Sequence, residues 1–224
     1  MRQRLVSVLF IIVLVFLLSV TSFASGMLGD SSWPRARRDN KNTGSTDIIG
    51  PSEPEIKWVY ESSGQMSYST PVIGIDGTIY IGTIQQASEV LAINPDGTLK
   101  WKIAVEGGPS PWVQASGAVG KDGTLYIGYG ATAPADYNLL AINPDGTIKW
   151  KVPTGAACYG SPGISDDGLV YFSAGTGAGQ YKLMAFNLQG EEQWTAQASN
   201  WIYTSPATAD DGTIYFGGRD GHIR

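Results

Sequence analysis

The sequence of 224 residues has few of the side chains on which several large classes of enzyme depend. It contains one cysteine, Cys158, and one histidine, His222, so it can form no disulfide within the chain, no Cys/His zinc cluster and no multi-histidine metal centre. Charged residues make up only 16% of the chain, and acids outnumber bases to give a net charge of −5. This balance argues against a nucleic acid as the partner.

A long apolar run occurs only at the start of the chain. Arg2 and Arg4 precede the run Leu5–Val20, and small residues follow up to Ala24, which is the pattern of a secretory signal peptide over residues 1–24. We expect cleavage after Ala24, leaving an exported chain of net charge −7; an uncleaved membrane anchor is the alternative. Because no cysteine lies near the cleavage site, we expect a periplasmic, cell-surface or extracellular protein without a lipid anchor.

Glycine, by contrast, is abundant, and turns built on it recur at a fixed period. Asp-Gly turns followed by an apolar residue and tyrosine are spaced 46, 45 and 44 residues apart; they begin at Asp76, Asp122, Asp167 and Asp211. A second signature, Ala-x-Asn-x-x-Gly-x-x-x-Trp, keeps the same period and spans Ala92–Trp101, Ala141–Trp150 and Ala185–Trp194. A repeat of about 45 residues is typical of a solenoid or a propeller.

Each repeat contains four short strand patterns separated by turns. In the first repeat we expect strands over 69–74, 78–83, 89–94 and 99–105, with a tight hairpin at Asp76-Gly77. No helical period appears outside the leader. Small antiparallel sheets that are apolar on both faces suit stacking between neighbours, so the sequence predicts an all-β fold, a β-propeller of four-stranded blades.

The Ala-to-Trp signature resembles the tryptophan-docking motif of pyrroloquinoline-quinone (PQQ) dehydrogenase propellers and of PQQ-like repeat proteins, the BamB-like proteins among them. The resemblance covers residues 56–224 and extends to Arg-Asp-x-x-x-Thr-Gly in the lead-in segment. It implies that the tryptophan ending each fourth strand lies against the next blade. The residues that match this structural role are Trp58, Trp101, Trp150 and Trp194.

The domain organisation follows from the same repeats. We expect a lead-in segment over 25–55 that is solvated, because its basic cluster around Arg35 is balanced by acids. The propeller, 56–224, would open with a lone fourth strand over Ile56–Glu61 and stop within its fourth blade. PQQ-type propellers have seven or eight blades, so we expect an incomplete segment of about four blades, with self-association through its bare faces. Closure into a four-bladed ring is the alternative.

The resemblance also bears on cofactors. PQQ enzymes hold the quinone beside a pair of adjacent cysteines and bind Ca²⁺ through a carboxylate and an asparagine, whereas this chain has a single cysteine. Its Asp-Gly sites are spread one to a hairpin, where aspartate simply favours the turn. We therefore expect no catalytic residue, no bound PQQ and no metal site.

Aromatic residues in the loops are the remaining candidates for binding. The loops that enter the first strand and join the second and third strands share one face of a propeller. They carry amphipathic aromatics with few charges: Tyr68, Trp112, Tyr129, Tyr137, Tyr159, Trp201 and Tyr203. Trp112, Trp201 and Tyr159 are the candidate recognition residues. Packing between blades is the alternative role for the tyrosines.

These observations lead to one functional hypothesis and two alternatives. The hypothesis is an exported, non-enzymatic module that scaffolds or binds protein partners in the cell envelope. The first alternative is a fragment of a PQQ-dependent dehydrogenase, for which PQQ and calcium would be required. The second is a carbohydrate-binding propeller that uses the aromatic face.

Overall fold

The computed structural model describes residues 28–107, 111–130, 138–175 and 181–224. The expected signal peptide and Tyr137 lie outside these ranges. All elements of secondary structure within them are strands, joined by turns and loops, so the all-β prediction is confirmed. None of the described residues belongs to a helix long and apolar enough to cross a membrane.

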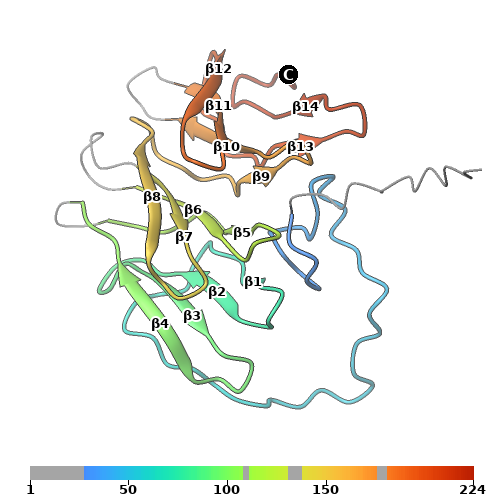
Figure 1. The fold of residues 1–224 in the computed structure, drawn as a ribbon, viewed down its shortest axis with the longest axis vertical. Helices are drawn as coiled ribbons and strands as arrows, with labels where there is room; N and C mark the ends of the chain where they lie inside the picture. The colour runs from blue at the N-terminus through green and yellow to red at the C-terminus, as the bar shows by residue number, and fades with distance from the viewer. Residues whose placement is uncertain (1–27, 108–110, 131–137, 176–180) are drawn as a thin grey trace, which may run out of the picture.

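The strands form three antiparallel sheets of four and one of two, each ordered as in the sequence. We refer to these sheets as blades 1 to 4. Blades 1 to 3 succeed one another from bottom to top of Figure 1, and blade 4 lies to the right of blade 3. Blade 1 holds β1 (Val72–Ile73), β2 (Ile79–Gly82), β3 (Glu89–Ile93) and β4 (Leu99–Ala104); blade 2 holds β5 (Ala118–Val119), β6 (Leu125–Tyr129), β7 (Asn138–Ile142) and β8 (Ile148–Pro153). Blade 3 holds β9 (Gly163–Ile164), β10 (Leu169–Gly175), β11 (Tyr181–Asn187) and β12 (Glu192–Ala198); blade 4 holds β13 (Ala207–Thr208) and β14 (Ile214–Tyr215).

The hydrophobic core lies between the blades rather than inside a single one. One cluster joins Val72 and Val90 of blade 1 to Leu125 and Ile127 of blade 2, and equivalent clusters join blade 2 to blade 3 and blade 3 to blade 4. The second and third strands of blades 1 and 2 are buried almost throughout, as their apolar sequence predicts. Stacked four-stranded sheets with this core form a partial propeller.

The Asp-Gly hairpins form as expected. At the first, Gly77 has φ of +80° and its N–H donates to the Gly74 carbonyl at 3.0 Å. Asp76 accepts hydrogen bonds from the backbone N–H and the hydroxyl of Thr78, at 3.0 and 2.8 Å. The carboxylate is thus engaged within its own turn, as proposed for turn aspartates.

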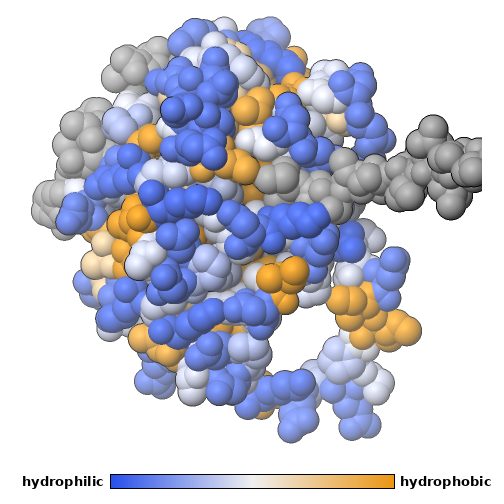
Figure 2. Space-filling model, viewed as in Figure 1, coloured by the Kyte–Doolittle hydropathy of each residue, from blue (hydrophilic) through white to orange (hydrophobic). Residues whose placement is uncertain are grey.

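The expected strand over Ile56–Glu61 is wrong. This segment follows the long connection that passes around the outside of the molecule in Figure 1, and it pairs with no strand of the described residues. Tyr60 nevertheless packs against Ile81, Leu91 and Ile93 on the outer face of blade 1. The connection also carries the exposed Ile48 and Ile49, and Figure 2 shows an apolar patch there.

The expectation that the basic cluster of the lead-in is solvated is wrong for Arg35, which is fully buried. Figure 1 shows this segment beside β5 and β13, at the axis of the blades. Its backbone bonds to the first strands of several blades: Ile73 N–H to the Trp33 carbonyl at 2.7 Å, Val119 N–H to Pro34 at 2.8 Å, and Thr208 N–H to Asn40 at 2.9 Å. First strands of only two residues leave ladder positions open, and the lead-in occupies them.

Candidate functional site

Three of the four tryptophans that the resemblance singles out contact the neighbouring blade. Each indole N–H donates to a carbonyl oxygen in the hairpin before that blade's fourth strand: Trp58 to Pro95 at 2.9 Å, Trp101 to Pro144 at 3.0 Å and Trp150 to Leu188 at 2.9 Å. Trp101 and Trp150 also pack against a tyrosine of their own blade, with ring centroids 5.6 and 5.7 Å apart. Each of these two indoles therefore links two sheets.

A glycine lies beneath each of these indoles. Gly146 has φ of +89°, and a β-carbon there would lie 2.8 Å from Cγ of Trp101. Gly97 and Gly190 meet Trp58 and Trp150 in the same way. The glycine in the motif is thus required twice, by the left-handed backbone and by the close approach of the ring.

Trp194 carries the same motif but has different surroundings. It packs against Tyr171 of its own blade, with ring centroids 5.7 Å apart. Within the described residues its indole N–H has no acceptor in another blade, and the residue is 36% exposed. Trp194 thus supplies a natural comparison for Trp101 and Trp150.

Two of the three candidate recognition residues meet in one aromatic cluster. Trp201 stacks on Tyr203 with centroids 5.5 Å apart and planes at 19°, and Tyr159 lies 4.9 Å from Tyr203 and 6.3 Å from Trp201. Tyr181, at the start of β11, adds a fourth ring 6.4 Å from Trp201. We call these four residues the aromatic cluster. It combines the loops before β9 and β13 with the end of the loop between β10 and β11.

The structure places the third candidate, Trp112, elsewhere. Trp112 lies between blades 1 and 2, where its backbone forms bridges to Ile84 and Gly130. Its indole is half-buried over Gly130. Tyr129 does not face the solvent either, because it is buried and its hydroxyl accepts a hydrogen bond from Asn138 at 3.0 Å. Tyr68 is 77% exposed.

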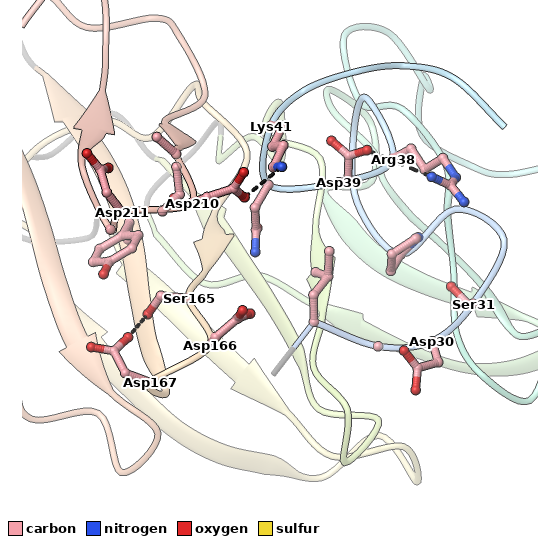
Figure 3. Close-up of a pocket in the computed structure, with 18 residues that line it drawn as sticks. Asp30, Ser31, Arg38, Asp39, Lys41, Ser165, Asp166, Asp167, Asp210 and Asp211 are labelled. Atoms are coloured by element: carbon pink, nitrogen blue, oxygen red, sulfur yellow. Dashed lines mark hydrogen bonds and ion pairs between the residues drawn. The ribbon is translucent and has the colours of Figure 1, made fainter. Parts of the chain in front are cut away.

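A cleft of about 820 Å³ lies on the side of the Asp-Gly hairpins, between the lead-in segment and blades 3 and 4. Six aspartates and two basic residues line it: Asp30, Asp39, Asp166, Asp167, Asp210 and Asp211, with Arg38 and Lys41. Figure 3 shows Asp210 directed toward Lys41, whereas Asp211 lies on the other side of the hairpin. The adjacent acids point apart, which does not suit paired acid–base chemistry.

Local bonds engage several of the charges in this acidic cleft. Lys41 Nζ lies 2.6 Å from Asp210 Oδ1, and this hydrogen bond raises the pKa of Lys41. Burial alone would raise the pKa of Asp39, but hydrogen bonds from Thr43 and the charge of Arg38 outweigh it and lower that pKa. Within the described residues, no group of three or more histidine, cysteine or acidic side chains is arranged to hold a metal ion.

The described residues also do not fit a PQQ site of the dehydrogenase kind. Cys158 is buried, its thiol lies 3.3 Å from the Ala156 carbonyl oxygen, and desolvation raises the pKa of that thiol. It is therefore a packed, protonated thiol, and as a single cysteine it cannot form the pair of adjacent cysteines of the PQQ enzymes. The prediction that the chain binds no cofactor stays a prediction.

Sequence reasoning missed two features of these surfaces. The repeat pattern gave no reason to select Tyr181, because it follows a glycine-rich loop rather than a turn signature. Arg35 was grouped with its exposed neighbours because nothing in a local sequence distinguishes a buried arginine. A positional signal existed for Tyr159 and Tyr203, since both precede a Ser-Pro pair at the same spacing.

Comparisons with known proteins give a consistent picture. Residues 86–224 match the sequence profile of a family described as "Outer membrane protein assembly factor BamB". BamB from Moraxella catarrhalis has a similar structure, with a TM-score of 0.56 and 17% identity over 75% of this chain and 50% of that one. The chain thus spans about half the length of that BamB.

Two further solved structures share the fold. A protein of unknown function from Bacteroides caccae has a TM-score of 0.52 and 18% identity, covering 88% of this chain and 69% of that one. A europium-containing methanol dehydrogenase has a TM-score of 0.52 and 14% identity, covering 73% of this chain and 41% of that one. No curated protein matches the sequence.

Proposed function

Because the chain belongs to the PQQ-like repeat family described as outer membrane protein assembly factor BamB, we propose that it is a non-enzymatic module that binds protein partners in the cell envelope. The proposal includes export through the leader over residues 1–24 and the absence of a lipid anchor. The family and the fold support the envelope setting. The partner and the mode of binding are proposed from the site.

The aromatic cluster is the observation that carries the proposal. Its rings are partly exposed, with Tyr203 at 45%, although stacking on neighbours could have covered them. Tryptophan and tyrosine are enriched at the centres of protein interfaces, because they bury much area at a low cost in conformational entropy. A cluster of four such rings on one face therefore favours a protein partner.

The two alternatives differ in support. A dehydrogenase has the same fold, but fold alone does not imply function, and the single cysteine of this chain cannot form the pair of adjacent cysteines of the PQQ enzymes. Carbohydrate binding is favoured by one observation, the stacked pair of Trp201 and Tyr203, because sugar rings also pack on aromatic faces. A glycan array on the wild type and on Trp201→Ala would identify that activity.

Site-specific photo-crosslinking in envelope extracts tests the proposal. A photo-reactive aromatic residue at position 203 is compared with one at 215, since Tyr203 and Tyr215 are similarly exposed, at 45% and 50%. We expect a discrete adduct with one protein from position 203 only, and its loss on Trp201→Ala. The same adducts at both positions, or none at 203, would contradict the proposal.

A further inference from the structure

A second, smaller cavity adjoins the aromatic cluster. It has a volume of about 370 Å³ and is lined by Arg37, Asn42, Tyr203, Thr204 and Ser205. Tyr203 belongs to both the cavity and the cluster, so the two form one continuous surface. We call the five lining residues the Arg37 cavity.

Arg37 differs from the arginines on either side of it in the lead-in. Arg35 is buried, and Arg38 pairs with Asp39 at 3.8 Å. Arg37 is exposed, and among the described residues its guanidinium has neither a carboxylate within 4.0 Å nor a hydrogen-bond acceptor. Its backbone carbonyl accepts hydrogen bonds from Asp39 and Gly44 N–H within the turn, at 2.9 and 3.0 Å, while its side chain stays exposed. The cavity therefore presents a cation without a counter-ion.

Asn42 forms part of the wall of the same cavity. Its amide nitrogen donates to the Pro206 carbonyl at 3.4 Å, which ties the wall to the segment just before β13. Its Oδ1 atom is buried, so Arg37 is the polar group that the cavity offers to a ligand.

The charge distribution favours an acidic ligand on this face. The acidic cleft and the Asp-Gly hairpins concentrate carboxylates on the opposite side of the blades. Near the aromatic cluster, Arg219 bonds through its backbone N–H to the Trp201 carbonyl at 2.8 Å, and Asp220 is paired with Arg224 at 2.5 Å. The aromatic face is thus locally basic although the chain as a whole is acidic.

We propose that the Arg37 cavity and the aromatic cluster together dock an acidic peptide segment of the partner. This inference rests on the proposed function. A carboxylate of the peptide pairs with Arg37, and a neighbouring apolar side chain packs on Trp201 and Tyr203. The opposite charges raise the association rate and set the register, while the rings provide the buried apolar area.

Selection from a random peptide library displayed on phage tests this inference with the purified protein. We expect the wild type to select peptides that place an aspartate or glutamate beside an apolar residue, and Arg37→Gln to lose that selection. Arg38→Gln is the matched control, because Arg38 lines the acidic cleft instead. The absence of any acidic enrichment, or the same enrichment on Arg37→Gln, would overturn the inference.

A binding measurement quantifies the role of Arg37. Its outcomes also distinguish a failure of this inference from a failure of the proposed function. By fluorescence anisotropy, we expect the selected peptide to bind Arg37→Gln about tenfold more weakly than the wild type, and its glutamine counterpart to bind the wild type equally weakly. Polygalacturonate serves as an acidic glycan probe; Arg37-dependent binding of it without any peptide binding would overturn the inference. If crosslinking at position 203 persists unchanged in Arg37→Gln, the inference fails while the proposed function stands.

Discussion

Neighbouring blades are linked in two regions of different character, the rim and the axis. At the rim, Trp101 and Trp150 repeat the same contacts from one blade to the next. At the axis, the lead-in reaches the first strands at irregular intervals along its own sequence. The carbonyls of Trp33, Pro34 and Asn40 accept backbone bonds from β1, β5 and β13, and the Asn40 side chain bonds to Ile164 of β9. The comparison teaches that one repeated motif can join similar surfaces, whereas an irregular segment is needed where surfaces differ.

The largest effect is expected at the rim. Trp150→Ala removes the ring packed on Tyr126 and the bond to the Leu188 carbonyl, so we expect a loss of about 3 kcal/mol in the free energy of unfolding. Trp194→Ala is the matched control, because its indole joins no second blade of the described residues. We expect it to cost about 1 kcal/mol. Urea titrations followed by circular dichroism measure both, and equal losses would show that the contact between blades contributes little.

The axis is tested by removing the buried guanidinium. Arg35 donates to Asn40 Oδ1 at 3.1 Å and to the Pro206 carbonyl at 3.4 Å, and desolvation lowers its pKa to about 10. Arg35→Leu leaves these acceptors without that donor but also removes the desolvation cost, so we expect a net loss of about 2 kcal/mol.

Limited proteolysis shows which segment of the chain that loss of stability affects. We expect Arg35→Leu to expose the lead-in to cleavage, and Arg37→Leu to serve as the exposed control. A variant that is as stable and as resistant as the wild type would mean that backbone bonds alone hold the lead-in.

A smaller effect separates the two reasons for glycine at the rim. Gly146→Ala meets both a left-handed φ and the Trp101 ring at 2.8 Å, whereas Gly212→Ala has φ of +84° with no atom within 4 Å of the added carbon. We expect Gly212→Ala to cost about 1 kcal/mol and Gly146→Ala about 1 kcal/mol more. Urea titrations of both variants measure the difference between their free energies of unfolding. Equal costs would mean that the indole moves aside freely.

The smallest expected effect concerns pH. Burial would raise the pKa of Asp76, but hydrogen bonds from Lys100 and Thr78 outweigh it and lower that pKa to about 2. An unfolded aspartate has a pKa of about 3.9, so the unfolded chain takes up the proton first. The stability that Asp76 contributes is complete above about pH 4 and is lost as the pH falls toward 2.

Stability measured from pH 6 to 2 checks this prediction. Because the pair of Asp76 and Lys100 is partly exposed, we expect a contribution of at most about 1 kcal/mol. Asp76→Asn should flatten the pH dependence. A pH profile of Asp76→Asn identical to that of the wild type would contradict the assignment.

Much of the fold could be predicted because it depends on patterns among residues that are close in the sequence. In blade 1, the strands expected over 69–74 and 78–83 contain β1 and β2. The segment Ile56–Glu61 was predicted incorrectly, because a strand requires a partner and its own residues carry no information about one. The aromatic cluster was predicted only in part. Its ring contacts depend on how the loops before β9 and β13 converge with the start of β11.

The sequence by itself determined the repeating blade, since turn chemistry and short apolar runs act over fewer than fifty residues. The tertiary structure alone decided the path of the lead-in, the burial of Arg35 and the isolation of Arg37 beside Tyr203. The physical reason is that a charge is solvated or buried according to what surrounds it in space. Pro206 beside Arg35 and Tyr203 beside Arg37, for example, are more than a hundred residues away in the chain.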